Sequence, residues 1–151
     1  MVGSGSAGIV CAFAALLTGQ TGIFRTAFAA SFISKLSDTV SSEVGKGYGK
    51  STYSLLTFQR VAPGTEGAVS LEGTAGGIVA AIVYSLAALV LGQVDLQGAA
   101  ICAVAATASN IVESYMGAVV QGRVPWLTND VVNVIQISLA AALAAVLQAS
   151  R

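Results

Sequence analysis

Most residues that could do chemistry lie in one stretch of the chain, Ser34–Thr74. It holds eight of the fourteen charged side chains, whereas the segments on either side consist almost wholly of Ala, Val, Leu, Ile and Gly. The eight are Lys35, Asp38, Glu43, Lys46, Lys50, Arg60, Glu66 and Glu72. Because apolar flanks need no charged insert for their own folding, we expect the functional site in this stretch.

Two smaller polar groups lie further along the chain. Asn110 and Glu113 come near the end of an apolar segment, and Asn129, Asp130 and Asn133 begin the last one. Carboxylates, amides, hydroxyls and lysines suit magnesium and phosphate, because magnesium typically takes one or two carboxylates together with substrate phosphates. Lysines neutralise phosphates, and phosphoryl transfer needs little from a protein beyond such positioning.

Composition excludes several other chemistries. With no His, a Ser–His–Asp triad is impossible, and with two Cys the usual zinc ligand sets cannot be assembled. Cys11 and Cys102 lie in apolar runs, so we interpret them as small buried hydrophobic residues. Zero formal net charge and the lack of a lysine-rich run argue against nucleic acid as a partner.

The glycines and lysines between Gly45 and Ser51 do not form a P-loop. That motif needs a glycine five residues before its Gly-Lys pair, whereas position 44 is Val and no predicted strand precedes the segment. Backbone N–H groups of a glycine-rich loop, together with two lysines, could still hold phosphate in a nest.

Composition also places the chain in a membrane. Mean hydropathy is +0.80 and only 9% of residues are charged, against roughly 25% in soluble domains. Because about 20 apolar residues cross the hydrocarbon layer, the sequence predicts a single-domain (residues 1–151), all-α polytopic membrane protein with four to five transmembrane helices. The predicted helices are Ile23–Val44, Thr74–Gly92, Gly98–Val120 and Asn129–Ala149, with Ala7–Thr18 as a short or partly inserted one.

Between the first two long helices, Gly45–Gly73 is predicted to be a polar, glycine-rich loop. Within it, Thr52–Val61 predicts a short strand or hairpin and Pro63-Gly64 a turn. If all four long helices cross the membrane, this loop and the two smaller polar groups fall on one side. Most lysines and arginines fall there too, which predicts that this side faces the cytoplasm or stroma.

Four segments carry a resemblance to a known membrane family. They read KLSDTVSSEVGKGYGKSTY, VAPGTEGAVSLEGTAGG, SNIVESYMGAVVQ and LTNDVVNVIQIS, in the family's order. The chain resembles the family called domain of unknown function 92, or transmembrane protein 19-like, and within it the phytyl-phosphate kinases of plants and cyanobacteria. The resemblance implies an integral membrane enzyme of plastids or cyanobacteria. It would phosphorylate phytyl monophosphate with a nucleoside triphosphate, for tocopherol and phylloquinone synthesis.

Candidate roles follow once the motifs are placed. The family's D-x-x-x-x-E element falls on Asp38 and Glu43, and its E-S-x-x-G element begins at Glu113. From their chemistry, we expect Asp38 and Glu43 to hold Mg²⁺ and all three acids to be catalytic. The predicted substrate- and nucleotide-binding residues are Lys35, Ser42, Lys46, Lys50, Arg60, Thr65, Glu66, Ser70, Asn110, Asn129, Asp130 and Asn133. A phytyl chain would lie between helices rich in small residues.

Other functions fit part of the same pattern. The residues alone leave open a small transporter or channel and a structural membrane subunit, and a nucleotidyltransferase acting on a lipid phosphate would use the same groups. A transporter should carry polar residues along both halves of its spans, whereas here they gather at one end, which favours an enzyme. Family members carry further helices before the first motif, so we expect a fragment. The nucleotide donor, the prenyl preference and the oligomeric state stay open.

Overall fold

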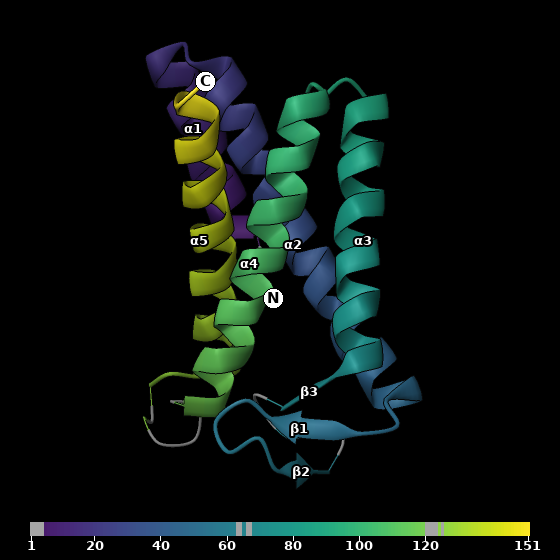
Figure 1. Ribbon diagram of the computed structural model, residues 1–151. Coiled ribbons are helices and arrows are strands. Elements are labelled where there is room, and N and C mark those ends of the chain that lie inside the picture. The colour runs from purple at the N-terminus through teal and green to yellow at the C-terminus, as the bar shows by residue number, and fades with distance from the viewer. Residues whose placement is uncertain (1–4, 63–64, 66–67, 120–123, 125) are drawn as a thin grey trace.

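The computed structural model describes residues 5–62, 65, 68–119, 124 and 126–151, which form a helical bundle with a small sheet at one end (Figure 1). In chain order the elements are α1 (Ser6–Thr18), α2 (Thr21–Tyr48), β1 (Thr52–Ser54), β2 (Arg60–Val61), β3 (Ala68–Ser70), α3 (Leu71–Val90), α4 (Leu96–Val119) and α5 (Asn129–Ala149). Of the described helices, α3, α4 and α5 are long and apolar enough to cross a membrane, and α1 is a shorter apolar helix. The predicted all-α membrane architecture is confirmed.

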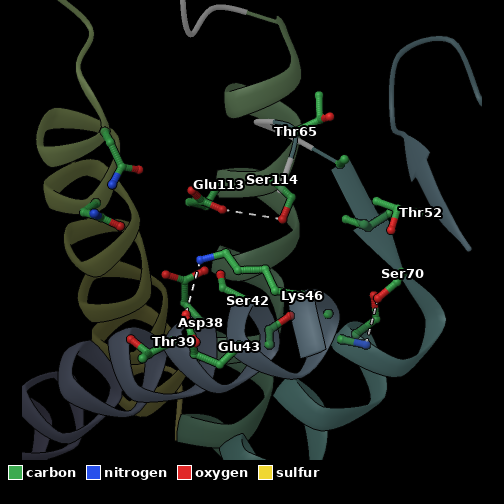
Figure 2. A pocket seen from close by; sticks show the side chains of 18 of the residues that line it. Asp38, Thr39, Ser42, Glu43, Lys46, Thr52, Thr65, Ser70, Glu113 and Ser114 are labelled. Atoms are coloured by element: carbon green, nitrogen blue, oxygen red, sulfur yellow. Dashed lines mark hydrogen bonds and ion pairs between the residues drawn. The ribbon is translucent and has the colours of Figure 1, made fainter. Parts of the chain in front are cut away.

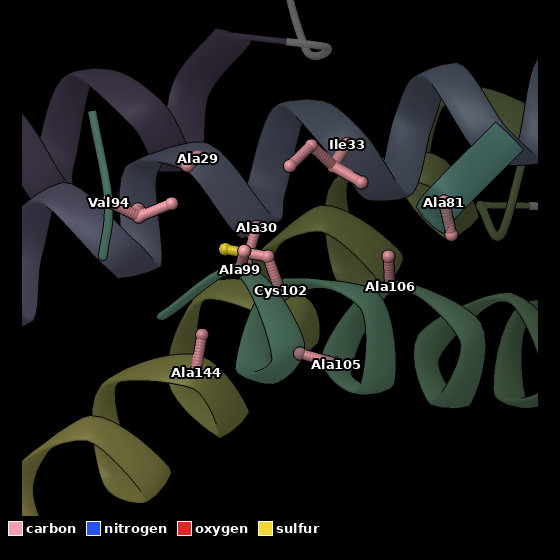
Figure 3. Close-up of a cluster of buried hydrophobic side chains, with 10 residues drawn as sticks. All are labelled: Ala29, Ala30, Ile33, Ala81, Val94, Ala99, Cys102, Ala105, Ala106 and Ala144. Carbon is pink, nitrogen blue, oxygen red and sulfur yellow. The ribbon is translucent and has the colours of Figure 1, made fainter. Parts of the chain in front are cut away.

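Small side chains hold the helices together, and large apolar ones face outward. Figure 3 shows a core built mainly of alanine, to which only Ile33, Val94 and Cys102 add larger groups. Outside, Phe13, Leu86 and other large apolar side chains are exposed. In lipid no hydrophobic force drives helices together, so close van der Waals contact through small residues has to do so. As predicted, Cys11 and Cys102 are both buried, and both are free thiols.

Two helices are longer than the sequence suggests. The predicted loop begins at Gly45, but α2 continues to Tyr48, where the Gly49 amide donates to the Gly45 carbonyl. Gly45–Tyr48 therefore belong to a helix and do not form the glycine-rich loop that was expected to hold phosphate in a nest. At the other end of the predicted loop, Ser70 caps α3, because its hydroxyl accepts from the Gly73 amide at 3.1 Å.

The remaining polar segment forms a three-stranded antiparallel sheet in the order β2-β1-β3. The predicted strand or hairpin is the β1–β2 pair, in which Thr52 lies opposite Val61. The sequence did not predict β3, whose Ser70 lies opposite Thr52 on the other side of β1. Because β3 ends at Ser70 and α3 begins at the next residue, the sheet is attached directly to a membrane helix. The predicted turn at Pro63-Gly64 lies outside the described residues.

The two ends of the bundle differ in chemistry. Around the sheet lie the end of α2, the start of α3, the end of α4 and the start of α5, so the polar segments do converge at one end (Figure 1). At the far end, Arg25 donates to the Gly92 carbonyl at 2.6 Å. There Arg151 also donates two hydrogen bonds to the Asp95 carboxylate, at 2.8 and 3.1 Å.

The backbones of α2 and α3 come close together beside the sheet. A Cβ atom on Gly73 would lie 2.8 Å from the Ser41 carbonyl oxygen and 3.0 Å from the Gly45 Cα atom. On Gly77 it would lie 2.9 Å from the Ser41 Cβ atom. Real Cβ atoms do not approach backbone this closely, so glycine at these positions allows the two helices to touch.

Replacing Gly73 should therefore separate the two helices. We expect Gly73→Ala to lower the free energy of unfolding in detergent micelles by about 1–3 kcal/mol, because the methyl group meets backbone that cannot move aside. Gly47→Ala is the matched control within α2, since nothing lies within 4 Å of its added Cβ atom. Equal stabilities of the two variants would contradict this packing.

The Asp95–Arg151 pair should make stability depend on pH. The pKa of Asp95 is lowered, first by its hydrogen bond from Arg151 and then by the Gly98 amide. A lowered pKa stabilises the fold above the ordinary aspartate value of about 3.9, and the effect is lost as pH falls through the folded-state value. We expect Asp95→Asn, which keeps the helix cap, to have a lower Tm than the parent at pH 7, and this difference to shrink below about pH 4. A difference that stays constant with pH would refute the charge pair as its cause.

Candidate functional site

A polar pocket of about 430 Å³ opens at the sheet end of the bundle (Figure 2). Its side chains come from α2, the sheet, the start of α3, the end of α4 and the start of α5. The predicted site residues that line it are Lys35, Asp38, Ser42, Glu43, Lys46, Thr65, Ser70, Glu113, Asn129 and Asn133. In Figure 2, Glu113 and Ser114 on α4 face the α2 side chains across the pocket, with Thr52 and Ser70 to one side.

Four other predicted residues do not line this pocket. Lys50 and Arg60 are exposed, and the Arg60 guanidinium donates to the Lys50 carbonyl at 2.8 Å, so the pair ties β2 to the segment before β1. Asp130 is exposed in the first turn of α5, where a carboxylate favours the helix dipole. The fourth, Asn110, lies in a hydrogen-bonded network between the helices. One further predicted residue, Glu66, falls outside the described residues.

Lys35 joins α2 to α5 at the pocket wall. Its ammonium group donates to Asp38 at 2.8 Å and to Asn133 at 2.8 Å. The Lys35 and Asp38 side chains are only 25% and 14% exposed, so the pair is shielded from water. Shielding strengthens a charge pair and makes the loss of one partner costly. Lys35 is thus held in place before any ligand binds.

The second lysine of the pocket is held more loosely. Lys46 lies 3.2 Å from Glu43, and the two side chains are 57% and 70% exposed. An exposed pair of this kind contributes little to stability. Lys46 is therefore free to leave Glu43 for an anion in the pocket at small cost.

A hydrogen-bonded network supports the pocket from the bundle interior. The Ser34 and Ser109 hydroxyls lie 2.8 Å apart, which connects α2 to α4. The Asn110 amide lies 2.8 Å from the Ser37 hydroxyl and 2.6 Å from the Gln136 amide, which adds α5. Hydrogen bonds of this kind join transmembrane helices where lipid offers no other partner. The asparagine predicted to bind substrate therefore positions the helices that carry the pocket.

Thr52 is a pocket residue that the sequence did not indicate. Only 6% of it is exposed, and its hydroxyl oxygen has no hydrogen-bond partner among the described residues. It lines the pocket from the middle strand of the sheet (Figure 2). A buried hydroxyl without a partner is costly, so this group points to a ligand that completes it. The only sign of it in the sequence is its position in a predicted strand, where side chains alternate between the two faces. Which face Thr52 occupies is known only once the strand is seen beside the pocket.

The oxygen-rich lining suits a hard cation. Asp38, Glu43 and Glu113 border the same pocket as hydroxyl and amide oxygens. Within the described ranges no three acidic, histidine or cysteine side chains come together as a ready metal cage. Magnesium seldom uses such a cage, because it keeps waters and takes one or two carboxylates together with substrate phosphates. The residues thus fit Mg²⁺ brought with a phosphate ligand.

Comparisons with known proteins agree with the membrane fold. Residues 1–141 match the family described as Integral membrane protein DUF92. Protein VTE6, chloroplastic, of Arabidopsis thaliana is 46% identical over 156 residues, which cover 98% of this chain and 46% of that protein. Uncharacterized membrane protein sll0875 of Synechocystis is 45% identical over 123 residues, which cover 82% of this chain and 48% of that protein.

These relatives bear on two predictions. The chain spans about half the length of the curated relatives it matches, and no solved structure matches it. The resemblance drawn from the four sequence segments is confirmed, as is the expected location in a plastid or cyanobacterial membrane.

Thr52 gives a test of the pocket that does not depend on turnover. Thr52→Val removes a hydroxyl that bonds nothing in the described part of the protein, so we expect the free energy of unfolding to stay the same or rise. Binding of a nucleoside triphosphate and of a prenyl monophosphate is measured separately by calorimetry in micelles. We expect the affinity for one of these two ligands to fall by about fivefold, the effect of one lost hydrogen bond. Thr52→Ser, which keeps the hydroxyl, should bind normally. Lower stability with unchanged binding would show that the hydroxyl serves the fold instead.

Proposed function

Because this chain belongs to the DUF92 family of integral membrane proteins, we propose that it carries the phosphate-handling site of a membrane phosphotransferase. The reaction transfers the γ-phosphoryl group of a nucleoside triphosphate to phytyl or another prenyl monophosphate, giving the diphosphate used for tocopherol and phylloquinone synthesis. The observation that carries the proposal is the pocket itself, in which two lysines and three carboxylates meet at the polar end of a membrane bundle.

The charges of the pocket suit two phosphate groups that repel each other. An attacking phosphate monoester is already largely ionised near pH 7, because its second pKa is about 6, so the reaction needs no strong base. What it needs is positive charge between the two anions and a fixed approach. Lys35, held by Asp38 and Asn133, supplies a fixed charge, and Lys46 supplies a movable one.

The bonds exchanged are simple. A phosphate oxygen of the lipid attacks the γ-phosphorus, a new P–O bond forms, and the bond to the β,γ-bridging oxygen breaks, so that the nucleoside diphosphate leaves with that electron pair. Bound Mg²⁺ would supply positive charge to the phosphates. Asp38 and Glu43 are the residues that would hold it, with Glu113 on the facing helix. Thr52 and Ser42 offer hydroxyls to phosphate oxygens.

A transporter is the less favoured alternative. The side-chain network that joins α2, α4 and α5 includes Ser34 and Ser109. Closer to the far end, the buried hydroxyls of Thr26 and Ser31 hydrogen-bond the backbone of their own helix, at 3.1 and 2.7 Å. Around them the core is mainly alanine, with Ile33, Val94 and Cys102. The side-chain network of the described residues thus lies toward the sheet end, which favours an enzyme over a transporter.

Product analysis tests the proposed reaction. The chain is placed in proteoliposomes with phytyl monophosphate, Mg²⁺ and each γ-labelled nucleoside triphosphate in turn. We expect the label to appear in a lipid diphosphate, with release of nucleoside diphosphate. Release of pyrophosphate would instead establish nucleotidyl transfer. A lack of any lipid product with all donors would overturn both reactions.

Two isosteric substitutions test the site. Asp38→Asn and Glu113→Gln should each lower kcat by about 10²-fold or more, the usual effect of removing one preorganised electrostatic group, while membrane insertion stays intact. Asp95→Asn is the matched control, because it makes the same change at the far end of the bundle. Near-normal rates in both site variants would refute the assignment.

A further inference from the structure

A smaller hollow of about 160 Å³, here named the α3–α4 groove, lies next to the polar pocket and shares lining residues with it. The residues that line both are Ser41, Val69, Thr74 and Ser114. Beyond this shared wall the groove is lined by Leu55, Gly77, Ile78, Thr107 and Ile111, among others. A site rich in charge and a site rich in hydrocarbon therefore meet at one wall.

The outer end of the groove faces the membrane. Ile78 on α3 is 40% exposed and Ile111 on α4 is 58% exposed. Both lie about 10–12 Å inside the sheet ends of their helices, at 1.5 Å of rise per residue. Figure 1 shows α3 and α4 close together at their connecting turn and spread apart toward the sheet. Ile78 and Ile111, which line the groove, lie on the spread part of these two candidate membrane-spanning helices.

On the basis of the proposed function, we propose that the α3–α4 groove holds the first part of the hydrocarbon chain of the lipid substrate. The phosphate lies in the polar pocket, and the rest of the chain passes between α3 and α4 into the bilayer. An amphiphilic substrate needs both environments within reach of each other, and the shared wall provides this. Ligand pockets commonly measure about 300–1,000 Å³, so the small groove suits only part of such a chain.

The polar groups at the groove do not oppose this occupant. The Asn110 amide, which also lines it, is already bonded to Ser37 and Gln136. Ser41, Thr74 and Ser114 lie on the side shared with the polar pocket, next to where the phosphate would be. Ile78 and Ile111 offer the chain van der Waals contacts at one fixed place beside the polar pocket. These two isoleucines thus select for a chain and contribute nothing to a substrate that lacks one.

A photoreactive lipid tests the route without turnover. The reagent is a prenyl monophosphate with a diazirine near the phosphate end of its chain, used with the intact chain in proteoliposomes. We expect cross-links in peptides containing Ile78, Thr107 or Ile111, and their loss in excess phytyl monophosphate. Cross-links confined to outward-facing residues such as Phe13 and Leu86, and unaffected by the competitor, would overturn the proposal.

A matched pair of variants tests selection. Ile111→Trp fills the groove at a position that faces lipid, and Val104→Trp makes the same change two turns earlier on the same face of α4, at a site 59% exposed. We expect Ile111→Trp to lower kcat/KM for phytyl monophosphate by about tenfold, because the indole group would occupy the place of the chain beside the phosphate. Its kcat/KM for methyl phosphate, which carries no hydrocarbon chain, and both values for Val104→Trp should not change. Equal losses on both substrates, or in both variants, would refute the groove as the chain site.

The two proposals can fail separately. If the parent chain phosphorylates neither phytyl monophosphate nor methyl phosphate, the phosphotransferase proposal fails while the competed cross-links still decide the groove. If the parent is active but the cross-links lie elsewhere, the groove proposal fails alone.

Discussion

The contact between the backbones of α2 and α3 is the constraint on which the rest of the structure depends. At Gly73 and Gly77 the two helices come so close that a single methyl group would meet the Ser41 backbone or side chain. Because β3 passes directly into α3, this contact also fixes the sheet against the end of α2. The sheet in turn turns Thr52 toward the pocket. The two glycines of α3 thereby allow side chains from α2, the sheet and α4 to gather around the polar pocket.

The shielded charge of Lys35 lies where partners are fixed beside it. Lys35 lies fourteen residues into α2, deep enough that an unpaired ammonium group would be costly near lipid. Asp38 and Asn133 meet it there, and the network through Asn110 and Gln136 holds the helices that bring them together. The exposed Lys46–Glu43 pair needs no such support. The pocket thus combines a rigid wall with one mobile cation, an arrangement suited to a ligand that arrives and leaves.

The features that could be predicted from the sequence depend on patterns within one segment of the chain. Apolar runs predicted the membrane helices, and alternation of crossings predicted that the polar segments meet at one end. Which lysines and arginines reach the pocket is not local: Arg60 has the right charge, but β2 is an outer strand and its guanidinium binds the Lys50 carbonyl. Gly45 and Gly47 are typical of a loop, yet α2 continues through both of them to Tyr48. Thr52 carried no signal because a hydroxyl is informative only once its neighbours are known.

The alanine core described above reverses the usual pattern of mutational tolerance. In a soluble domain the largest losses come from truncating big interior side chains, whereas here the interior offers few atoms to remove. Enlargement is the damaging direction, since added methylene groups force the backbones apart. On the lipid side, swaps among Ile, Leu, Val and Phe change little. Substitutions should therefore be tolerated over the lipid-facing surface of such a protein and rarely tolerated at the small residues where its helices touch.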